Sequence, residues 1–308
     1  MKTVITSSYL KASGFIRKGE LVAFPTETVY GLGANVFDKQ AVSKIFKVKK
    51  RPPDNPLIVH VSRKRDIFML ADDIPEYAVK LMDSFFPGPL TLVLRRNEMI
   101  PDIVTSGLDS VAVRMPSLMI ARKFIKACGV PVAAPSANIS GKPSPTDYTH
   151  VIADLNGKIS CILKGPRPRF GLESTVVDCT EENPVLLRPG SLSADEIRKV
   201  VPLRMHRSDV GIAKSPGMKY RHYSPQARVI FYGNSKRPHV NSAYIGILKP
   251  VGDFAIIKIC RDLNDYARNL FYFFRKCDDL GIKYIYVQKV RKVGAGLAIM
   301  DRLKKATD

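Results

Sequence analysis

Four cations crowd into five positions where Lys47, Lys49, Lys50 and Arg51 follow one another. Two prolines come next and end the preceding amphipathic helix, because proline has no amide hydrogen and biases the residue before it toward extended geometry. A short apolar run then predicts a buried strand with His60 at its end. Cations held stiffly in this way suit an anion site, but a helix C-terminus also favours solvated cations. From this stretch alone, an anion site and a solvated helix end are equally good interpretations.

Loops with hydroxyl, amide or cationic side chains adjoin several predicted strands, at the edge where open α/β sheets place ligands. In chain order these side chains are Thr26, Thr28, Asn55, Ser136, Asn138, Ser144, Thr146, Ser174 (beside Glu173) and Arg188. Each one has a purely structural explanation, since Ser, Asn and Thr are ordinary turn residues. What distinguishes them is their recurrence next to successive strands.

Arg114 lies within a run that is typical of a strand, VAVRMP. A guanidinium near a buried strand end needs an anion, and the carboxylate of a substrate would serve. His60 has the same ambiguity, and composition alone slightly favours a histidine satisfied within the core.

Several familiar sites are absent from the sequence. No GxxxxGK[ST] loop occurs, and residues 31–33 lack the third glycine of the dinucleotide fingerprint. HExxH, GxSxG and paired Cys/His sets are missing too. Glu27, Asp54 and Glu173 are single acids, so hydrolysis by two carboxylates has no support.

The composition is that of a globular protein outside the membrane and secretory classes. The 308 residues, 45% hydrophobic and 25% charged, are enough for two domains. No apolar stretch reaches the length of a transmembrane helix, and the N-terminus has no apolar signal region. Five scattered cysteines without a CxxC pair predict reduced, buried thiols. We therefore expect a cytoplasmic protein with no membrane contact.

A net charge of +21 indicates a polyanionic substrate or partner, such as a nucleotide or RNA. A nucleotide triphosphate needs only a few cations, so much of the charge remains for something else. A solubility or thermal-adaptation trait with no partner is the alternative.

Strands and helices that alternate along the first 200 residues predict an α/β sheet domain. Strands are expected at 21–24, 57–59, 90–94, 111–115, 131–134, 159–163, 175–177 and 185–187. Residues 26–33 are expected as a polar loop. Asp38 and Asp147 are predicted to cap helices, and 67–86 to be helical with a break near Pro75.

A second, smaller α/β domain is expected after an aperiodic stretch. Strands are predicted at 229–231, 245–248, 255–257 and 284–287, and helices at 263–277 and 294–303. The expected organisation is a catalytic domain at 1–202, an ordered linker at 203–227 and a small domain at 228–308.

The ordered strings FPTETVYGLG, KKRPPDNPLIVHV, SVAVRMP, APSANISGKPSPT, ESTVVD and LLRPG resemble the YrdC-like family. SPGMKYRHYSP and the small domain after it resemble the two-domain form of that family, the threonylcarbamoyl-AMP synthases. The resemblance is dense over residues 19–190 and looser beyond. It implies a twisted mixed sheet with a positively charged cavity, followed by a linker and a small Rossmann-like domain.

The resemblance also implies a reaction. L-Threonine, bicarbonate and ATP would give threonylcarbamoyl-AMP and pyrophosphate, with Mg²⁺ arriving on ATP and no metal site in the protein. The product would pass to a separate transferase that makes threonylcarbamoyl-adenosine in tRNA. A carbamate formed from the threonine amine is already a nucleophile, so a nucleotidyl transfer of this kind needs no Ser/His/Asp apparatus.

Site residues follow from the resemblance motif by motif. The catalytic signature falls on Lys49 and Arg51. The threonine pocket would use Thr28, His60, Arg114, Ser136 and Ser174. The ATP site would use Arg51, Asn55, Ser110, Asn138, Thr146, Arg188 and Tyr223. Because Tyr223 lies in the linker, the linker would cross the mouth of the site.

Two departures from the family pattern accompany these matches. Lys50 stands where glycine is common, and Ser110 replaces a more usual threonine while keeping the hydroxyl. The rival hypothesis is a non-catalytic RNA-binding module that uses the basic cavity and surface, whose binding would weaken steeply with salt. A carbamoyltransferase-type YrdC domain is disfavoured, because no zinc-finger or acylphosphatase segments accompany it.

Overall fold

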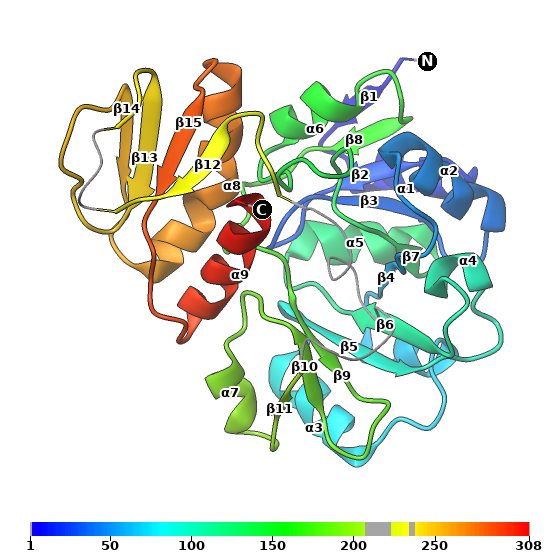
Figure 1. Cartoon of the computed structure of the whole chain (residues 1–308). Helices are drawn as coiled ribbons and strands as arrows, with labels where there is room; N and C mark the ends of the chain where they lie inside the picture. Colours follow the sequence, from blue (N-terminus) through cyan, green and yellow to red (C-terminus); the bar gives the residue numbers. More distant parts are fainter. Residues whose placement is uncertain (1, 207–222, 234–237, 308) are drawn as a thin grey trace.

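Two β-sheets organise the chain, one in a large N-terminal domain and one in a small C-terminal domain (Figure 1). The computed structural model describes residues 2–206, 223–233 and 238–307. The expected mixed α/β sheet followed by a smaller α/β domain is confirmed. Most of the expected linker, residues 207–222, lies outside the described residues. None of the helices in the described ranges combines the length and apolar character that crossing a bilayer requires.

The large sheet is mixed and runs in the order β1-β8-β2-β3-β7-β4-β6-β5-β9-β10-β11. Its strands are β1 (Val4–Thr6), β2 (Val22–Phe24), β3 (Gly31–Asn35), β4 (Ile58–His60), β5 (Leu90–Arg95), β6 (Ser110–Arg114), β7 (Val132–Ala133), β8 (Cys161–Leu163), β9 (Thr175–Asp178), β10 (Val185–Arg188) and β11 (Arg204–Met205).

The helices of this domain are α1 (Tyr9–Arg17), α2 (Lys39–Lys49), the 3₁₀ helix η1 (Lys64–Met69), α3 (Glu76–Phe85), α4 (Asp102–Thr105), α5 (Met119–Cys128), α6 (Tyr148–Leu155) and α7 (Ala194–Arg198). The expected break in the helical region before residue 86 is confirmed, since η1 and α3 are separate. The two predicted caps are also confirmed. The Asp38 carboxylate accepts backbone N–H bonds at the start of α2, and the Asp147 carboxylate does so at the start of α6.

The small domain has an all-parallel sheet in the order β12-β15-β13-β14. Its elements are β12 (Arg228–Phe231), β13 (Ser242–Gly246), β14 (Ile256–Ile259), α8 (Leu263–Asp279), β15 (Tyr284–Val287) and α9 (Ala295–Thr307). The strand expected at 245–248 begins and ends earlier in the structure, because the backbone of β13 pairs with both β14 and β15 over residues 242–246.

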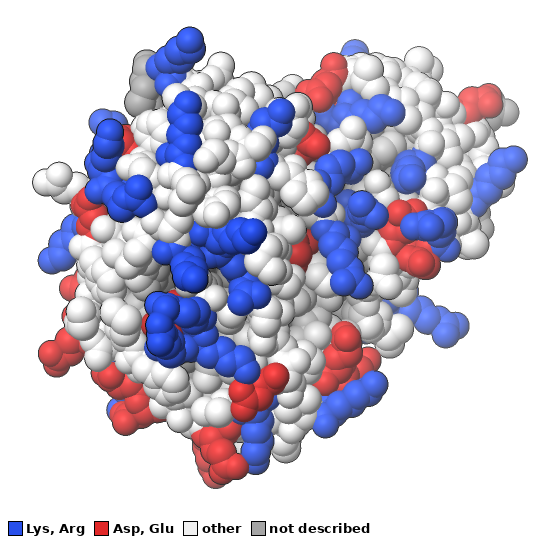
Figure 2. Space-filling model, turned by 180° about the vertical axis from the view of Figure 1, so that it is seen from behind, with Lys and Arg blue, Asp and Glu red and all other residues white. Residues whose placement is uncertain are grey.

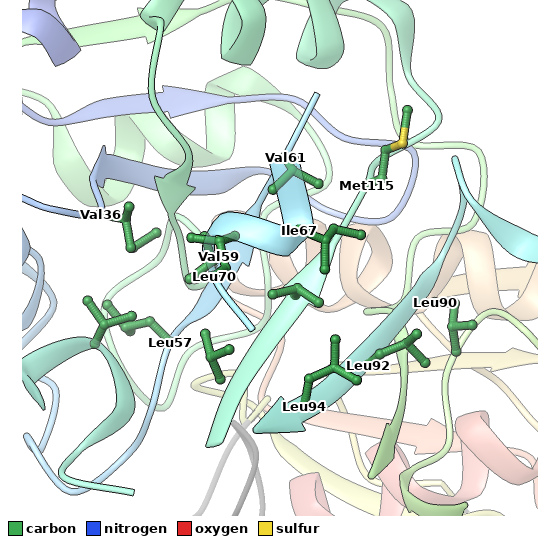
Figure 3. Close-up of a cluster of buried hydrophobic side chains, with 14 of the residues drawn as sticks. Val36, Leu57, Val59, Val61, Ile67, Leu70, Leu90, Leu92, Leu94 and Met115 are labelled. Carbon is green, nitrogen blue, oxygen red and sulfur yellow. The ribbon is translucent and has the colours of Figure 1, made fainter. Parts of the chain in front are cut away.

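Side chains on one face of a strand enter the hydrophobic core, and those on the other face can line a site. Around β4, Leu57, Val59 and Val61 enter the main hydrophobic cluster, which also receives Leu90, Leu92 and Leu94 around β5 (Figure 3). Successive side chains of a strand point to opposite faces. Ile58 and His60 therefore face the other side of the sheet, and both line a pocket there.

One sequence prediction is wrong, because residues 31–33 of the loop expected at 26–33 belong to the strand β3. It pairs antiparallel with β2 and with β7 in the middle of the sheet. Its glycines allow the close packing, because a Cβ on Gly33 would lie 2.6 Å from Cγ1 of Val132. Glycine has a low propensity for strands, so the sequence did not predict β3, and its pairing with β2 and β7 explains why it forms.

All five cysteines are buried and free, as expected. Burial raises the pKa of the Cys128 and Cys260 thiols to about 12, so these groups stay protonated at neutral pH.

Candidate active site

A pocket is lined by strand ends of the large domain and by the loops that adjoin them. Most of the site residues expected from the sequence meet there: Thr28, Lys49, Arg51, His60, Arg114, Ser136, Asn138, Ser174, Arg188 and Tyr223. The lining also includes Thr26, Ser144 and Glu173, which the pattern of polar loops indicated without assigning a role, and Ser140 and Lys142, which it did not indicate. Segments distant in the sequence thus form one polar, cation-rich cavity.

The C-terminus of α2 brings Lys49 into the pocket. Lys50 caps the helix in the left-handed conformation (φ 52°), which explains why glycine would suit this position. Lys49 itself is buried, and its Nζ donates to the carbonyl oxygens of Ser136 (2.5 Å) and Asn138. The ammonium thereby ties the end of α2 to the loop that carries two other predicted site residues.

Burial is the main reason that the pKa of Lys49 lies well below its ordinary value, and the positive charge of Arg51 lowers it further. An anion that enters beside Lys49 would favour the charged form and so bind more tightly. This is the electrostatic behaviour expected of a phosphate site.

Arg51 follows the helix and braces the proline-rich turn. Its Nε and Nη2 donate to the carbonyl of Asn55 (3.2 and 3.1 Å), and Nη2 also donates to the carbonyl of Pro56 (3.1 Å). These bonds hold the planar guanidinium in one orientation at the pocket wall.

Three predicted ATP-binding residues lie outside the lining of this pocket. Asn55 and Thr146 are buried, and Nδ2 of Asn55 and Oγ1 of Thr146 have no hydrogen-bond partner among the described residues. Ser110 begins β6 and is four residues from Arg114, about 13 Å along an extended strand. Buried polar atoms without partners are costly, so Asn55 and Thr146 keep capacity for a ligand, and all three roles stay predictions.

Parallel pairing of β4 and β6 sets His60 directly beside Arg114 in register. The His60 ring packs edge-on against Phe24, with the ring centroids 5.8 Å apart, and its Nδ1 lies 3.2 Å from the carbonyl oxygen of Ile58. Arg114 forms a buried ion pair with Glu27, whose Oε1 accepts from Nη2 at 2.6 Å. An apolar-facing imidazole and a paired guanidinium thus share one wall of the pocket.

His60 is expected to stay neutral throughout the physiological pH range. Burial lowers its pKa to about 3, and the charge of Arg114 adds to the shift. In the unfolded chain the same imidazole takes up a proton below about pH 6.5, so the free energy of unfolding should fall as the pH is lowered through that value.

Urea unfolding of the wild type and of His60→Gln at pH 7.5 and at pH 5 measures this contribution. The wild type should lose about 2 kcal/mol more than the variant between the two pH values. Equal losses in the two proteins would contradict the burial of a neutral histidine.

Another part of the pocket wall contains Ser174, directly before β9, and Arg188, at the end of β10. Arg188 is buried and donates to the backbone carbonyl of Ser174 from Nε (3.2 Å) and Nη2 (2.9 Å). The Ser174 hydroxyl pairs with that of Thr91 at 2.8 Å. Burial lowers the pKa of the Arg188 guanidinium. A cation of this kind, held close to a hydroxyl, can meet a phosphate or a carboxylate.

The small domain reaches this wall through α9. Arg302, which is fully buried, donates from Nε to Oε2 of Glu173 at 2.9 Å and from Nη1 to the carbonyl of Pro189 at 3.0 Å. The other oxygen of Glu173 accepts from the Ser144 hydroxyl at 2.5 Å. Burial alone would raise the pKa of Glu173, but the charges of Arg302 and Arg188 outweigh it and hold the pKa below its ordinary value.

A second buried arginine of the small domain supports the adjacent loop. Arg275 in α8 donates to the carbonyl of Pro143 (3.0 and 2.6 Å) and to the carboxylate of Asp154 (2.7 Å). The same carboxylate accepts from Lys142, which lines the pocket. Both helices of the small domain therefore brace loops of the site.

Tyr223 is the described part of the linker that reaches the pocket. It is buried in the left-handed conformation (φ 68°), and its ring stacks on that of Phe271 with centroids 5.2 Å apart. The Arg302 guanidinium lies 5.2 Å from the centre of the same ring. Tyr223 thus joins the pocket lining to the core of the small domain. The linker is expected to cross the mouth of the site, and most of its residues, 207–222, lie outside the described ranges.

Comparison with protein families gives two matches that together span most of the chain. The family Sua5_yciO_yrdC, described as telomere recombination, matches residues 14–190. The family described as threonylcarbamoyl-AMP synthase, C-terminal domain, matches residues 192–307.

Curated relatives match the full two-domain length. The threonylcarbamoyl-AMP synthase of Pyrococcus abyssi is 48% identical over 96% of this chain and 93% of its own. That of Bacillus subtilis is 41% identical over 96% of this chain and 92% of its own.

The crystal structure of P. abyssi Sua5 complexed with L-threonine is similar to this chain with a TM-score of 0.89 and 45% identity, covering 99% of this chain and 97% of that one. Escherichia coli YciO, with a TM-score of 0.53 and 22% identity over 61% of this chain, shares the fold of the large domain. The chain therefore belongs to the Sua5/YciO/YrdC family, in the two-domain branch that carries the C-terminal domain of the threonylcarbamoyl-AMP synthases.

Proposed function

We propose that this chain is a threonylcarbamoyl-AMP synthase that uses L-threonine, bicarbonate and ATP and releases pyrophosphate. The observation that carries the proposal is the pocket itself, where Lys49, Arg51 and Arg188 adjoin a wall formed by Arg114 and the hydroxyls of Thr28 and Ser174. The three cations suit the phosphates of ATP, and the wall around Arg114 suits an amino acid with a hydroxyl group. Full-length relatives named as threonylcarbamoyl-AMP synthases, and the threonine complex of P. abyssi Sua5, support this assignment.

In the proposed reaction the protein needs only to position the substrates and to neutralise charge, because the carbamate of threonine is itself the nucleophile. Attack at the α-phosphorus needs in-line geometry and neutralisation of the charge that develops on the phosphates. Arg51 is held in a fixed fork by two carbonyls, and Lys49 is fixed by two more. Such preorganised cations stabilise the transition state without reorganising during the reaction.

Recognition of threonine is assigned to the wall around Arg114. Its guanidinium would bind the α-carboxylate, and the hydroxyl of Thr28 or Ser174 would bond the side-chain hydroxyl of the substrate. A site built to bond that hydroxyl rejects analogues that lack it, because its own polar groups would be left unpaired. His60 would present a neutral imidazole beside them.

We assign Mg²⁺ to the substrate complex with ATP. No group of three or more His, Cys, Asp or Glu side chains in the described ranges could hold a metal ion. Magnesium keeps several waters and is commonly bound through substrate phosphates, so ATP can deliver it without a protein cage. We assign the reaction to the class of nucleotidyl transfers. We also place the protein in the reducing cytosol, because its buried cysteines are free.

The proposal predicts that pyrophosphate release from ATP depends on both L-threonine and bicarbonate. Purified protein should release pyrophosphate when all three substrates are present, with or without tRNA, and omission of either co-substrate should reduce release to background. Absence of release with all three substrates would contradict the proposal.

The alternative, a non-catalytic RNA-binding module, starts from the excess of 49 basic over 28 acidic residues. On one face of the molecule, basic side chains gather around a hollow and near the boundary with the small domain, while acidic ones line the lower edge (Figure 2). The family membership favours catalysis over this alternative. Binding of ATP and threonine at moderate salt without RNA distinguishes the two, since phosphate-dominated RNA binding weakens steeply with salt. Transfer of the product to a tRNA-modifying enzyme stays a proposal.

A further inference from the structure

Glu27 is a buried carboxylate directly behind the wall that is assigned to threonine. Its side chain is 5% exposed and that of its partner Arg114 is 4% exposed, so both members of the ion pair are desolvated. Glu27 itself does not line the pocket, whereas Arg114 does. A charged pair of this kind is costly to bury and adds little net stability over apolar residues of the same volume, which makes a role other than stability worth testing.

Several bonds fix Glu27 in place. Its Oε2 accepts from the backbone N–H of Leu118 (3.4 Å), and its own carbonyl accepts from the N–H of Phe170 (2.9 Å). The preceding residue, Thr26, accepts the N–H of Thr28 (3.2 Å) and donates to the carbonyl of Val29 (2.6 Å). The carboxylate therefore rests on a turn that its neighbours hold on both sides.

Arg114 is less constrained by other groups than by Glu27. Its Nη2 donates to Glu27 at 2.6 Å, whereas its Nε reaches the carbonyl of Gly88 only at 3.4 Å. Within the part of the chain that the structure describes, its Nη1 has no hydrogen-bond partner. The long flexible stem of an arginine allows many orientations, so the short bond to Glu27 determines which nitrogen remains for the pocket.

We propose that Glu27 is a positioning residue, which occupies one nitrogen of Arg114 and thereby directs the remaining N–H groups toward the α-carboxylate of the amino-acid substrate. This inference rests on the proposed function. Glu27 acts through Arg114 and touches no substrate atom. Its removal should weaken recognition of the carboxylate in particular, since a guanidinium binds a carboxylate well only in the planar, two-bond geometry.

The test compares L-threonine with L-threoninol, which lacks the carboxylate, as ligands of the full chain. Isothermal titration calorimetry of wild type, Glu27→Ala and Glu27→Gln gives the ratio of the two affinities. The ratio should fall about tenfold or more in Glu27→Ala. It should fall less in Glu27→Gln, because the amide oxygen can still accept from Nη2. In steady-state assays, KM for threonine should rise in Glu27→Ala by a similar factor, with KM for ATP changed less than about twofold.

Glu20→Gln is the matched control, because Glu20 pairs with Lys44 at the other end of β2, outside the pocket. It should leave the affinity ratio unchanged. A Glu27 variant that folds and keeps the wild-type ratio would overturn the inference, as would equal increases in KM for threonine and ATP. If Glu27→Ala does not fold, the ratio in Glu27→Gln decides: an unchanged ratio together with unchanged KM for threonine overturns the inference. A wild type that fails to bind threonine would instead contradict the proposed function.

Discussion

Arg51→Ala is expected to lower threonine-dependent pyrophosphate release by at least about a hundredfold, the scale seen when one preorganised donor to a developing negative charge is removed. Arg51 lines the pocket, and two carbonyls hold its guanidinium in one orientation. The transition state should lose this donor, while circular dichroism shows a folded protein. Initial rates at saturating ATP, threonine and bicarbonate measure the effect.

Lys47→Ala is the matched control for this variant. Lys47 belongs to the same cationic segment but is exposed and absent from the pocket lining. Its loss should change the rate by less than about twofold, since an exposed cation contributes little beyond general electrostatics. Arg51→Lys separates charge from geometry, because lysine keeps the charge and loses the planar fork. Turnover at the wild-type rate in Arg51→Ala would remove Arg51 from the catalytic set.

Arg302→Met is expected to lower the free energy of unfolding by about 3–5 kcal/mol, the cost of leaving one partner of a buried ion pair uncompensated. Arg302 is fully buried and its partner Glu173 nearly so. Methionine fills similar space without a charge, so the loss reports mainly the carboxylates left behind, above all Glu173, since Asp301 keeps its ion pair with Lys305. Urea unfolding followed by far-ultraviolet circular dichroism gives the change.

A double variant, Arg302→Met with Glu173→Gln, tests the cause. Removing both charges should recover part of the lost stability, because a buried Glu173 carboxylate is then no longer left without Arg302. Lys304→Met on the exposed side of the same helix should stay within about 0.5 kcal/mol of the wild type. A loss in the double variant that equals or exceeds that of Arg302→Met would show that packing of the long side chain, and not its charge, holds the two domains together.

Local rules that act over a few residues predicted much of the fold. Asp38 and Asp147 cap the helices that follow them, since an N-cap side chain needs only the next two or three amide groups. A short apolar run predicted the buried strand that ends at His60, and two prolines predicted the end of α2. The ordered motifs also indicated the residues that meet in the pocket, including Lys49.

The sequence by itself therefore determined the fold class, most of the strands and many of the residues that line the pocket. Only the tertiary structure decided where β3 lies and which partners the buried charges take. Glu27 reaches Arg114 across 87 residues, and Glu173 reaches Arg302 across 129. In the sequence each of these acids is an isolated charge, and no periodicity or spacing indicates which residue it pairs with. The physical reason is that a buried charge pairs with whatever the packed elements bring beside it, and that choice is made by the fold as a whole.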